Sequence, residues 1–253
     1  MKLCLKIFVV IFFTSCVNAK ENGETEITTE DGIEVFQNEK FYLLKKNVNI
    51  KSDNFNLNAD NVKINFDKNL YDITELNADG NVKFDSPEFK LKGSGDLLTF
   101  IIKIEKIKVK GKNSELITED INMFSDGLIE VNNMSGNFSL KGSNSKLISE
   151  NIIIKAESID GIFSKNSDKN EITFLEVIDN KISYVKNNDT EMYAKKINFN
   201  NNDSIIELIN NVTILRDEEN ITGDYGTLDT KNNSYKIKSS NATKVKVIIQ
   251  NNG

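Results

Sequence analysis

The side chains that could carry out chemistry in this sequence are almost all carboxylates and amines. The chain has 38 Asp and Glu residues and 32 Lys and Arg residues but no His, and its two Cys residues, Cys4 and Cys16, lie near the N-terminus. Ser-His and Cys-His nucleophile systems and imidazole metal sites are therefore excluded. A pair of carboxylates could still act as acid and base, but so many acidic residues form such pairs by chance. We predict no catalytic residue, no metal site and no cofactor.

The charge of the chain argues against nucleic acid as a partner. The formal net charge is −6, and the lysines do not gather into a basic stripe. A protein that neutralises phosphates needs such a surface. Hydrophobic residues make up 38% of the sequence, which is enough for a folded core.

Residues 1–19 have the features of a cleaved signal peptide. Lys2 and Lys6 supply positive charge, residues 7–13 are apolar, and "VNA" at 17–19 offers a small-residue cleavage site. The apolar stretch is shorter than the roughly 20 residues that span a bilayer. As an alternative, "FTSC" at 13–16 is similar to a lipoprotein processing site and would lipidate Cys16. Both routes lead out of the cytoplasm.

A short phrase, Asn-apolar-x-apolar, recurs along the chain. It begins at Asn47, Asn81, Asn137 and Asn211, and a variant begins at Lys106. In each copy apolar residues stand one, three and ten positions after the start, and a small residue stands at twelve. A longer, imperfect copy runs over residues 182–194. Repetition of this kind indicates one supersecondary unit stacked on itself.

The repeated unit has the pattern of β-strands. Its apolar residues alternate with polar ones, which is the period of a half-buried strand. Polar stretches such as "KSDN" (51–54) and "RDEE" (216–219) supply turns between the strands. No segment keeps a helical stripe for three turns. A series of short strands with regular turns is typical of a sandwich, a barrel or a jelly roll.

The alternation also changes phase inside the unit. In "FNLNADNVKINF" (55–66) the apolar residues are odd-numbered before Asp60 and even-numbered after it. A regular strand would place the two sets on opposite faces, whereas one extra residue at a bend would keep both on one inner face. The alternative is two separate short strands with no shared face. We predict bends at Ala59, Gly93, Thr118, Ala156, Ala194 and Gly223.

The predicted inner face combines the apolar residues of all copies. For any one of these residues, packing in an ordinary core is the simpler interpretation, so the prediction concerns the stripe as a whole. Its members are Val48, Ile50, Phe55, Leu57, Val62, Ile64, Phe66, Val82, Phe84, Phe89, Leu91, Ile107, Val109, Leu116, Ile121, Phe138, Leu140, Leu147, Ile197, Phe199, Val212, Ile214, Ile221 and Leu228.

The segments "LNADNVKINFD" (57–67), "ADGNVKF" (78–84) and "NNVTILRDEENITGDYGTLDTKNN" (210–233) resemble the OstA-like repeat of lipopolysaccharide-transport proteins. The resemblance runs from about residue 33 to residue 247. Within that family it is greatest to the soluble periplasmic bridge protein and second to its inner-membrane relative. It implies an all-β fold, an elongated, open and twisted jelly roll of repeated short antiparallel strands.

The resemblance also implies a function. The inner-face residues would form a lipid groove that shields lipopolysaccharide acyl chains in the periplasm, between the inner and outer membranes. Like jelly-roll domains of the inner- and outer-membrane components would be partners, joined head to tail through edge strands near 35–44 and 245–249, with self-association as a further outcome. Lysines near the ends, Lys45, Lys46, Lys244 and Lys246, could instead block such pairing.

The expected organisation is a signal peptide (1–19), a polar linker (20–32) and two OstA-like β modules (33–143 and 144–250). The bridge proteins usually carry about one such domain, whereas this chain is long enough for two modules or for one continuous, elongated roll. The short leader argues against the N-terminal membrane helix of the inner-membrane relative.

Two other functions stay open beside this non-enzymatic carrier. A structural or adhesin-like β-repeat protein of the cell envelope would share the composition and the leader, but its core would be closed and dry. A carboxylate-only polysaccharide hydrolase or lyase on a β-solenoid would be expected to offer aromatic platforms for sugars. The chain has no Trp and only six Tyr, which disfavours the enzyme.

Overall fold

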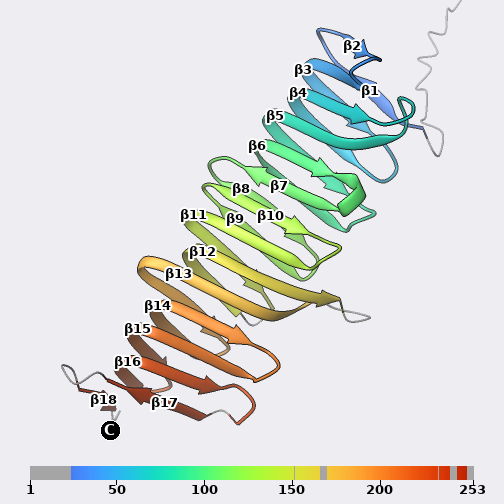
Figure 1. Ribbon diagram of the computed structural model, residues 1–253. Coiled ribbons are helices and arrows are strands. Elements are labelled where there is room, and N and C mark those ends of the chain that lie inside the picture. The colour runs from blue at the N-terminus through green and yellow to red at the C-terminus, as the bar shows by residue number, and fades with distance from the viewer. Residues whose placement is uncertain (1–23, 151, 166–169, 233, 240–243, 250–253) are drawn as a thin grey trace, which may run out of the picture.

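The computed structural model describes residues 24–150, 152–165, 170–232, 234–239 and 244–249. It is an all-β structure in which antiparallel strands stack one after another along a single axis, so that the first and last strands lie at opposite ends (Figure 1). The fold class is the predicted one, an elongated, twisted jelly roll. The predicted signal peptide and both Cys residues lie outside the described residues.

The strands vary from short edge segments to long bent ribbons, and one short 3-10 helix, η1 (Ile102–Ile104), follows the sixth strand. Their bounds are β1 (Glu26–Thr28), β2 (Ile33–Phe36), β3 (Phe41–Lys51), β4 (Asn56–Phe66), β5 (Ile73–Ser86), β6 (Leu91–Ile101), β7 (Lys106–Lys110), β8 (Ser114–Thr118), β9 (Ile121–Ser125), β10 (Leu128–Asn132), β11 (Asn137–Ser149), β12 (Ile152–Lys165), β13 (Asn170–Asn187), β14 (Thr190–Asn200), β15 (Ile205–Arg216), β16 (Glu219–Asp229), β17 (Ser234–Lys238) and β18 (Lys246–Ile249).

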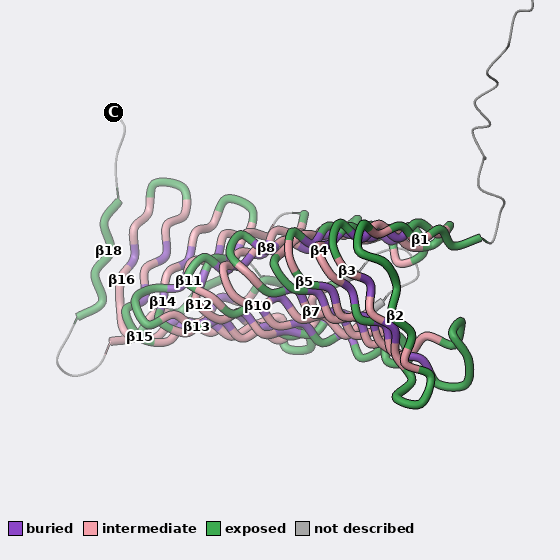
Figure 2. The backbone as a smooth tube through the Cα atoms, turned by 90° about the horizontal axis from the view of Figure 1, so that it is seen from above, coloured by how far each residue is buried: buried purple, intermediate pink, exposed green. Residues whose placement is uncertain are grey.

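The sheet is folded along its length into two layers. Each long strand bends near its middle, so that one half pairs in the first layer and the other half in the second; on β3, residues 41–45 pair with 61–65 of β4, and 48–51 pair with 56–59. Elsewhere the two halves are separate strands, as with β7 and β8, which both pair with β6. We call the line of bends the corner and the opposite side, where the turns between strands lie, the mouth. Buried positions occur on the strands of both layers from β3 to β16 (Figure 2).

Left-handed backbone at the corner explains why Asn recurs. Lys46 and Asn47 have φ of 66° and 52°, Gly80 and Asn81 have 74° and 51°, and Asn210 and Asn211 repeat the pattern. Gly and Asn are the residues that enter this region most easily, Asn because its short amide can hydrogen-bond locally. The Asn47 amide donates to Glu30 Oε1 (2.6 Å), and the Asn81 amide donates to Asp60 Oδ2 (3.0 Å). The phrases at Asn47, Asn81 and Asn211 therefore mark the corner.

Four of the six predicted bends are confirmed. The strand register shifts next to Ala59, Ala156, Ala194 and Gly223. Leu57 and Ile64, which precede and follow the first of these bends, are both buried in the same interior. An extra residue at the corner thus keeps both sets on one inner face, as expected for a bulge.

Two bend predictions were wrong. The bend on β6 lies between Gly95 and Leu97, whereas Gly93 is a paired residue opposite Phe84, where a Cβ would lie 2.6 Å from the phenyl ring. Thr118 instead ends β8 before a tight turn, where its hydroxyl donates to the Ile121 carbonyl (2.9 Å). A turn of two residues changes the phase of the alternation just as a bend does, so the sequence pattern could not separate the two cases.

The edges of the sheet differ from the prediction at one end. At the N-terminus the edge consists of β1 and β2, which among the described residues pair only with β3. β1 lies in the segment expected as a polar linker. Of the predicted edge at 35–44, residues 35–36 belong to the edge strand β2, whereas residues 41–44 belong to β3, an interior strand whose pairing continues on its other side with β4. At the C-terminus β18 lies at the edge, as predicted, with β16 as its described partner.

The expected boundary between two modules, at 143/144, falls at the bend of β11. This strand pairs with β9 and β10 on one side and with β12 on the other, so hydrogen bonding is continuous across the boundary. The division into two modules stays a prediction.

Substitution of Gly80 tests the corner. Gly80→Ala is expected to lower the free energy of unfolding by about 2 kcal/mol, because the residue is left-handed and a Cβ would lie 2.2 Å from Asp60 Oδ2. Gly32 also has positive φ, +95°, but nothing lies within 4 Å of its Cβ position. Gly32→Ala is therefore a matched control for backbone strain alone, at about 1 kcal/mol. Equal urea midpoints for the two variants would contradict this account.

Candidate functional site in the interior and mouth of the roll

The predicted inner-face residues all lie between the two layers. They are buried except for Phe55, Phe89, Leu91 and Phe199, which are partly exposed and pack against the core. They share this interior because residues opposite one another on paired strands point to the same side. The structure thus places every predicted residue on the inner face. Contact of these residues with lipid stays a prediction.

Sequence reasoning missed a second set of inner residues. They lie outside the recurring apolar positions of the phrase, and they show the same alternation; a search for period-two alternation alone would have found them. The larger members are Tyr42, Leu44, Leu76, Leu98, Phe100, Ile129, Ile154, Ile159, Phe163, Leu175, Val177, Val185, Ile206 and Leu208.

Aromatic rings close the mouth in the N-terminal half. Phe55 and Phe89, from turns of the second layer, both contact Phe100 of the first layer, with ring centroids 6.3 Å and 5.7 Å apart. Phe55 also stacks on Phe84 at 6.5 Å. Aromatic pairs at these distances attract one another beyond the area they bury. We call these four residues the aromatic cluster; it joins the two layers across the mouth.

The mouth is hollow further along the stack. A cavity of about 620 Å³ opens between second-layer residues such as Ile152 and first-layer residues such as Ile172 and Phe199. Beneath it lies a smaller cavity of about 100 Å³, whose lining is apolar apart from Asn187 and Thr230. Ile152, Ile172, Asn187 and Phe199 line both cavities. We call this opening the window.

A polar contact joins the layers near the C-terminal end. The Tyr235 hydroxyl, on β17 in the first layer, donates to Glu219 Oε2 at 2.7 Å, at the mouth end of β16 in the second layer. This hydrogen bond raises the pKa of Tyr235, with burial as a smaller cause. The window therefore lies between an aromatic closure on one side and a hydrogen-bonded closure on the other.

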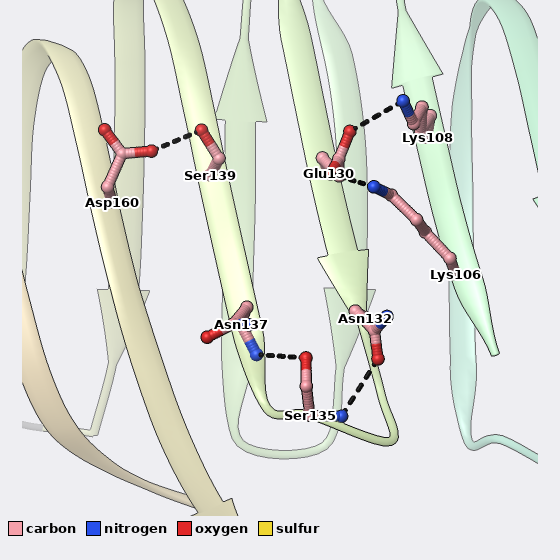
Figure 3. A network of polar contacts seen from close by, with 8 residues as sticks. All are labelled: Lys106, Lys108, Glu130, Asn132, Ser135, Asn137, Ser139 and Asp160. Carbon is pink, nitrogen blue, oxygen red and sulfur yellow. Dashed lines mark hydrogen bonds and ion pairs between the residues drawn. The ribbon is translucent and has the colours of Figure 1, made fainter. Parts of the chain in front are cut away.

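The outer face of the first layer carries carboxylates that already have partners. Glu130 lies between Lys106 and Lys108, at 2.5 Å and 3.0 Å, and Ser139 donates to Asp160 at 2.5 Å (Figure 3). Partial burial tends to raise the pKa of Glu130, but the hydrogen bonds from the two lysines outweigh it, and its pKa lies below the ordinary value. A general acid needs a raised pKa, so Glu130 does not have the character of one.

The part of the chain that the structure describes contains no group of three or more Asp, Glu, His or Cys residues placed to hold a metal ion. No helix within that part is long and apolar enough to cross a membrane. The predicted periplasmic leader lies outside it.

Comparison with known proteins places the chain in a family. The crystal structure of LptH, described as the LptA homologous periplasmic component of the lipopolysaccharide transport device of Pseudomonas aeruginosa, aligns with 52% of this chain and 95% of that chain, at 13% identity and a TM-score of 0.43. No curated protein sequence matches. The family model described as LptA/(LptD N-terminal domain) LPS transport protein matches residues 26–158, just over half of the chain. The chain therefore belongs to the family of LptA and the LptD N-terminal domain, a family of lipopolysaccharide transport proteins.

Proposed function

We propose that the protein is a non-enzymatic periplasmic carrier that shields lipopolysaccharide acyl chains between its two layers. The observation that carries the proposal is the continuous apolar interior with a window at the mouth. Exposing an acyl chain of about a dozen carbons to water costs roughly 10 kcal/mol, at ~0.8 kcal/mol per methylene. A carrier must replace water along that length with apolar surface, and it needs no reactive group to do so.

The rival function is a structural β-repeat with a closed core, and one observation favours it. The aromatic cluster closes the N-terminal half, and residues such as Leu140 and Leu147 are fully buried by neighbouring side chains. The window favours the carrier, because a purely structural roll has no need of an apolar opening beneath a polar surface.

Photo-crosslinking distinguishes the two functions. A photoreactive phenylalanine analogue at inner positions, Phe84, Leu91 or Phe199, is compared with the same probe at the outward-facing Lys83 or Lys92. With purified lipopolysaccharide, we expect labelling at one or more inner positions and background labelling at the outer ones. A folded protein that labels nowhere would leave the structural repeat as the function.

We also propose that the chain joins like domains head to tail, and that its two ends suit such contacts. Ile33 and Val35 pair with Leu44 and Tyr42 and share their inner face, yet they are 50% and 47% exposed. At the other end Val247, which pairs with Ile221, is 52% exposed. A strand from another domain would cover these side chains and would also hydrogen-bond to the unpaired backbone N–H and C=O groups of the edge strand.

The charges at the two ends are complementary. Residues 24–36 contain five carboxylates and no Lys or Arg, whereas the described residues 234–239 and 244–249 contain four lysines and no Asp or Glu. Near the first edge, Lys45 and Lys46 form ion pairs with Glu34 and Glu30, at 2.7 Å and 3.3 Å. These two lysines therefore belong to the acidic end and partly neutralise it. Opposite charges favour contact between unlike ends over contact between like ends.

A further inference from the structure

The interior is not equally accessible along its length, and this difference narrows the proposed lipid site. In the N-terminal half Phe84 and Phe100 are 5% and 8% exposed, and the rings of Phe55 and Phe89 pack against them at the mouth. At the window Ile152, Ile172 and Phe199 are only partly buried and face open space. An acyl chain that enters from the mouth would therefore meet aromatic rings in the N-terminal half and a cavity at the window.

We propose that lipopolysaccharide is held at the window by the tip of one acyl chain. The tip is inserted between Ile172 and Phe199 of the first layer and Ile152 and Val185 of the second. The aromatic cluster keeps the N-terminal half of the groove closed. The inference rests on the proposed function, which it narrows to one segment of the chain. Apart from Ile152, these residues lie beyond the region matched by the family model. Because these residues lie in the C-terminal half of the chain, this half would be the part that binds the acyl chain.

The depth of the window sets how much of a chain it admits. The lower cavity measures about 100 Å³, below the roughly 300–1,000 Å³ of sites that enclose a whole small ligand. Its floor consists of Leu175, Ile197 and Ile206, which are at most 5% exposed. The end of one acyl chain fits without rearrangement, and deeper entry requires the two layers to separate.

The rim of the window determines which end of the amphiphile enters. The upper cavity is bordered by Glu119, Asp120, Glu150 and Glu171, and Glu119 is ion-paired with Lys90 at 3.1 Å. Among the described residues that line the two cavities there is no Lys or Arg. Phosphate groups are held by lysine, arginine or backbone amides, and a carboxylate-bearing rim offers no such attraction. The phosphorylated head group would therefore stay outside, with only hydrocarbon below the rim.

The closures on either side fix the limits of the site. Toward the N-terminus, Phe55 and Phe89 reach across the mouth to Phe100. Toward the C-terminus, the Tyr235 hydroxyl reaches Glu219 in the other layer. Between these two contacts, the described residues show apolar side chains from both layers bordering open space, and this is the stretch that we assign to the acyl chain.

Probes that replace one Phe at a time test the assignment. A photoreactive phenylalanine analogue replaces Phe199 at the window, or Phe84 and Phe89 in the aromatic cluster, in the otherwise complete mature chain. Each replacement is close in shape to the original ring, and circular dichroism checks the fold. With lipopolysaccharide we expect about tenfold more labelling at Phe199 than at Phe84 or Phe89, which corresponds to about 1.4 kcal/mol of preference.

The outcomes separate this inference from the proposed function. Equal labelling at Phe199 and Phe84, or stronger labelling at Phe84, would overturn the window while leaving the carrier intact. Labelling at none of the three positions would contradict both the window and the proposed carrier function. Competition at Phe199 tests the identity of the ligand. If phospholipid vesicles free of lipopolysaccharide suppress the labelling as strongly as unlabelled lipopolysaccharide does, the assignment of lipopolysaccharide as the ligand would be overturned.

A pair of substitutions gives an independent check. Ile172→Asp places a charge on the wall of the window and is expected to weaken lipopolysaccharide binding about tenfold. Ile73→Asp makes the same change at another partly buried inner residue, near the mouth of the N-terminal half, and should leave binding within about twofold. Equal loss of binding in two variants with equal urea midpoints would count against the window.

Discussion

Lys244→Glu combined with Lys246→Glu is expected to weaken end-to-end association of the mature chain about 10- to 100-fold. Both lysines lie beside or within β18, the edge that would meet the acidic first edge of another copy. Each exposed ion pair contributes little, about 0.2–1 kcal/mol, but placing like charges face to face costs considerably more. The loss should be largest at low salt, where the Debye length exceeds ~10 Å, and should shrink as salt is added. Sedimentation velocity over a range of concentrations measures the effect.

A reciprocal variant shows whether the effect is specific to the two ends. Glu26→Lys with Asp31→Lys replaces two of the five carboxylates of residues 24–36 by lysines, and on its own it should weaken association to a similar degree. Mixing it with the Lys244→Glu, Lys246→Glu chain places the new lysines of one variant opposite the new glutamates of the other and should restore pairing between the two variants. Lys83→Glu with Lys92→Glu changes the same charge on the outer face of the second layer and should leave association unchanged. If the mixture stays monomeric while the unmodified chain associates, the ends do not meet in the proposed way.

The inner face was predictable because burial follows the alternation of residues along each strand. Every second residue of a strand points to the same side, so positions such as Val82 and Phe84 could be assigned before the fold was known. The same rule located the bend at Ala59, since an extra residue changes the phase. It failed at Thr118 because a tight turn between β8 and β9 produces the same change of phase.

The closure of the mouth could not be read from the sequence. Phe55 and Phe89 lie in turns just before β4 and β6, where no period fixes the direction of a side chain. Their contact with Phe100 depends on how the two layers approach one another, which is a property of the folded sheet. The window has the same origin: Ile152 and Ile172 are far apart in the paired register and meet only across the mouth.

The edge predicted at 35–44 includes the end of the edge strand β2 but also extends into the interior strand β3, for a related reason. The strand at Phe41–Lys51 has strong alternation, whereas β1 and β2 have only three and four residues and expose most of their side chains. Short, exposed edge strands carry little apolar pattern, which is one way in which sheets avoid uncontrolled pairing. A pattern search therefore favours the interior strand next to the true edge.

Leu147→Ala is expected to lower the free energy of unfolding by about 2–5 kcal/mol. Leu147 is 0% exposed and pairs with Met123 on one side and Ile154 on the other, which are themselves 1% and 0% exposed. So tightly packed a site cannot collapse around the missing atoms, and the cavity term adds to the lost burial. Leu97→Ala removes the same atoms from an outward-facing residue that is 46% exposed, and should cost less than about 0.5 kcal/mol. Urea unfolding followed by circular dichroism compares the two.

The same variant tests whether the roll is one unit or two. In a stacked architecture each strand contacts only its neighbours, so a defect spreads only as far as the strands unfold together. Because β11 is hydrogen-bonded to strands on both sides of the 143/144 boundary, we expect Leu147→Ala to reduce hydrogen-exchange protection in β4 and β15 as well as in β11. Retained protection in β4 with loss from β11 onward would mean that the N-terminal half unfolds separately. In two separately stable modules, the aromatic cluster could stay closed while the window opens wider. In a single cooperative roll, the aromatic cluster and the window must open together, or the window admits only the tip of an acyl chain.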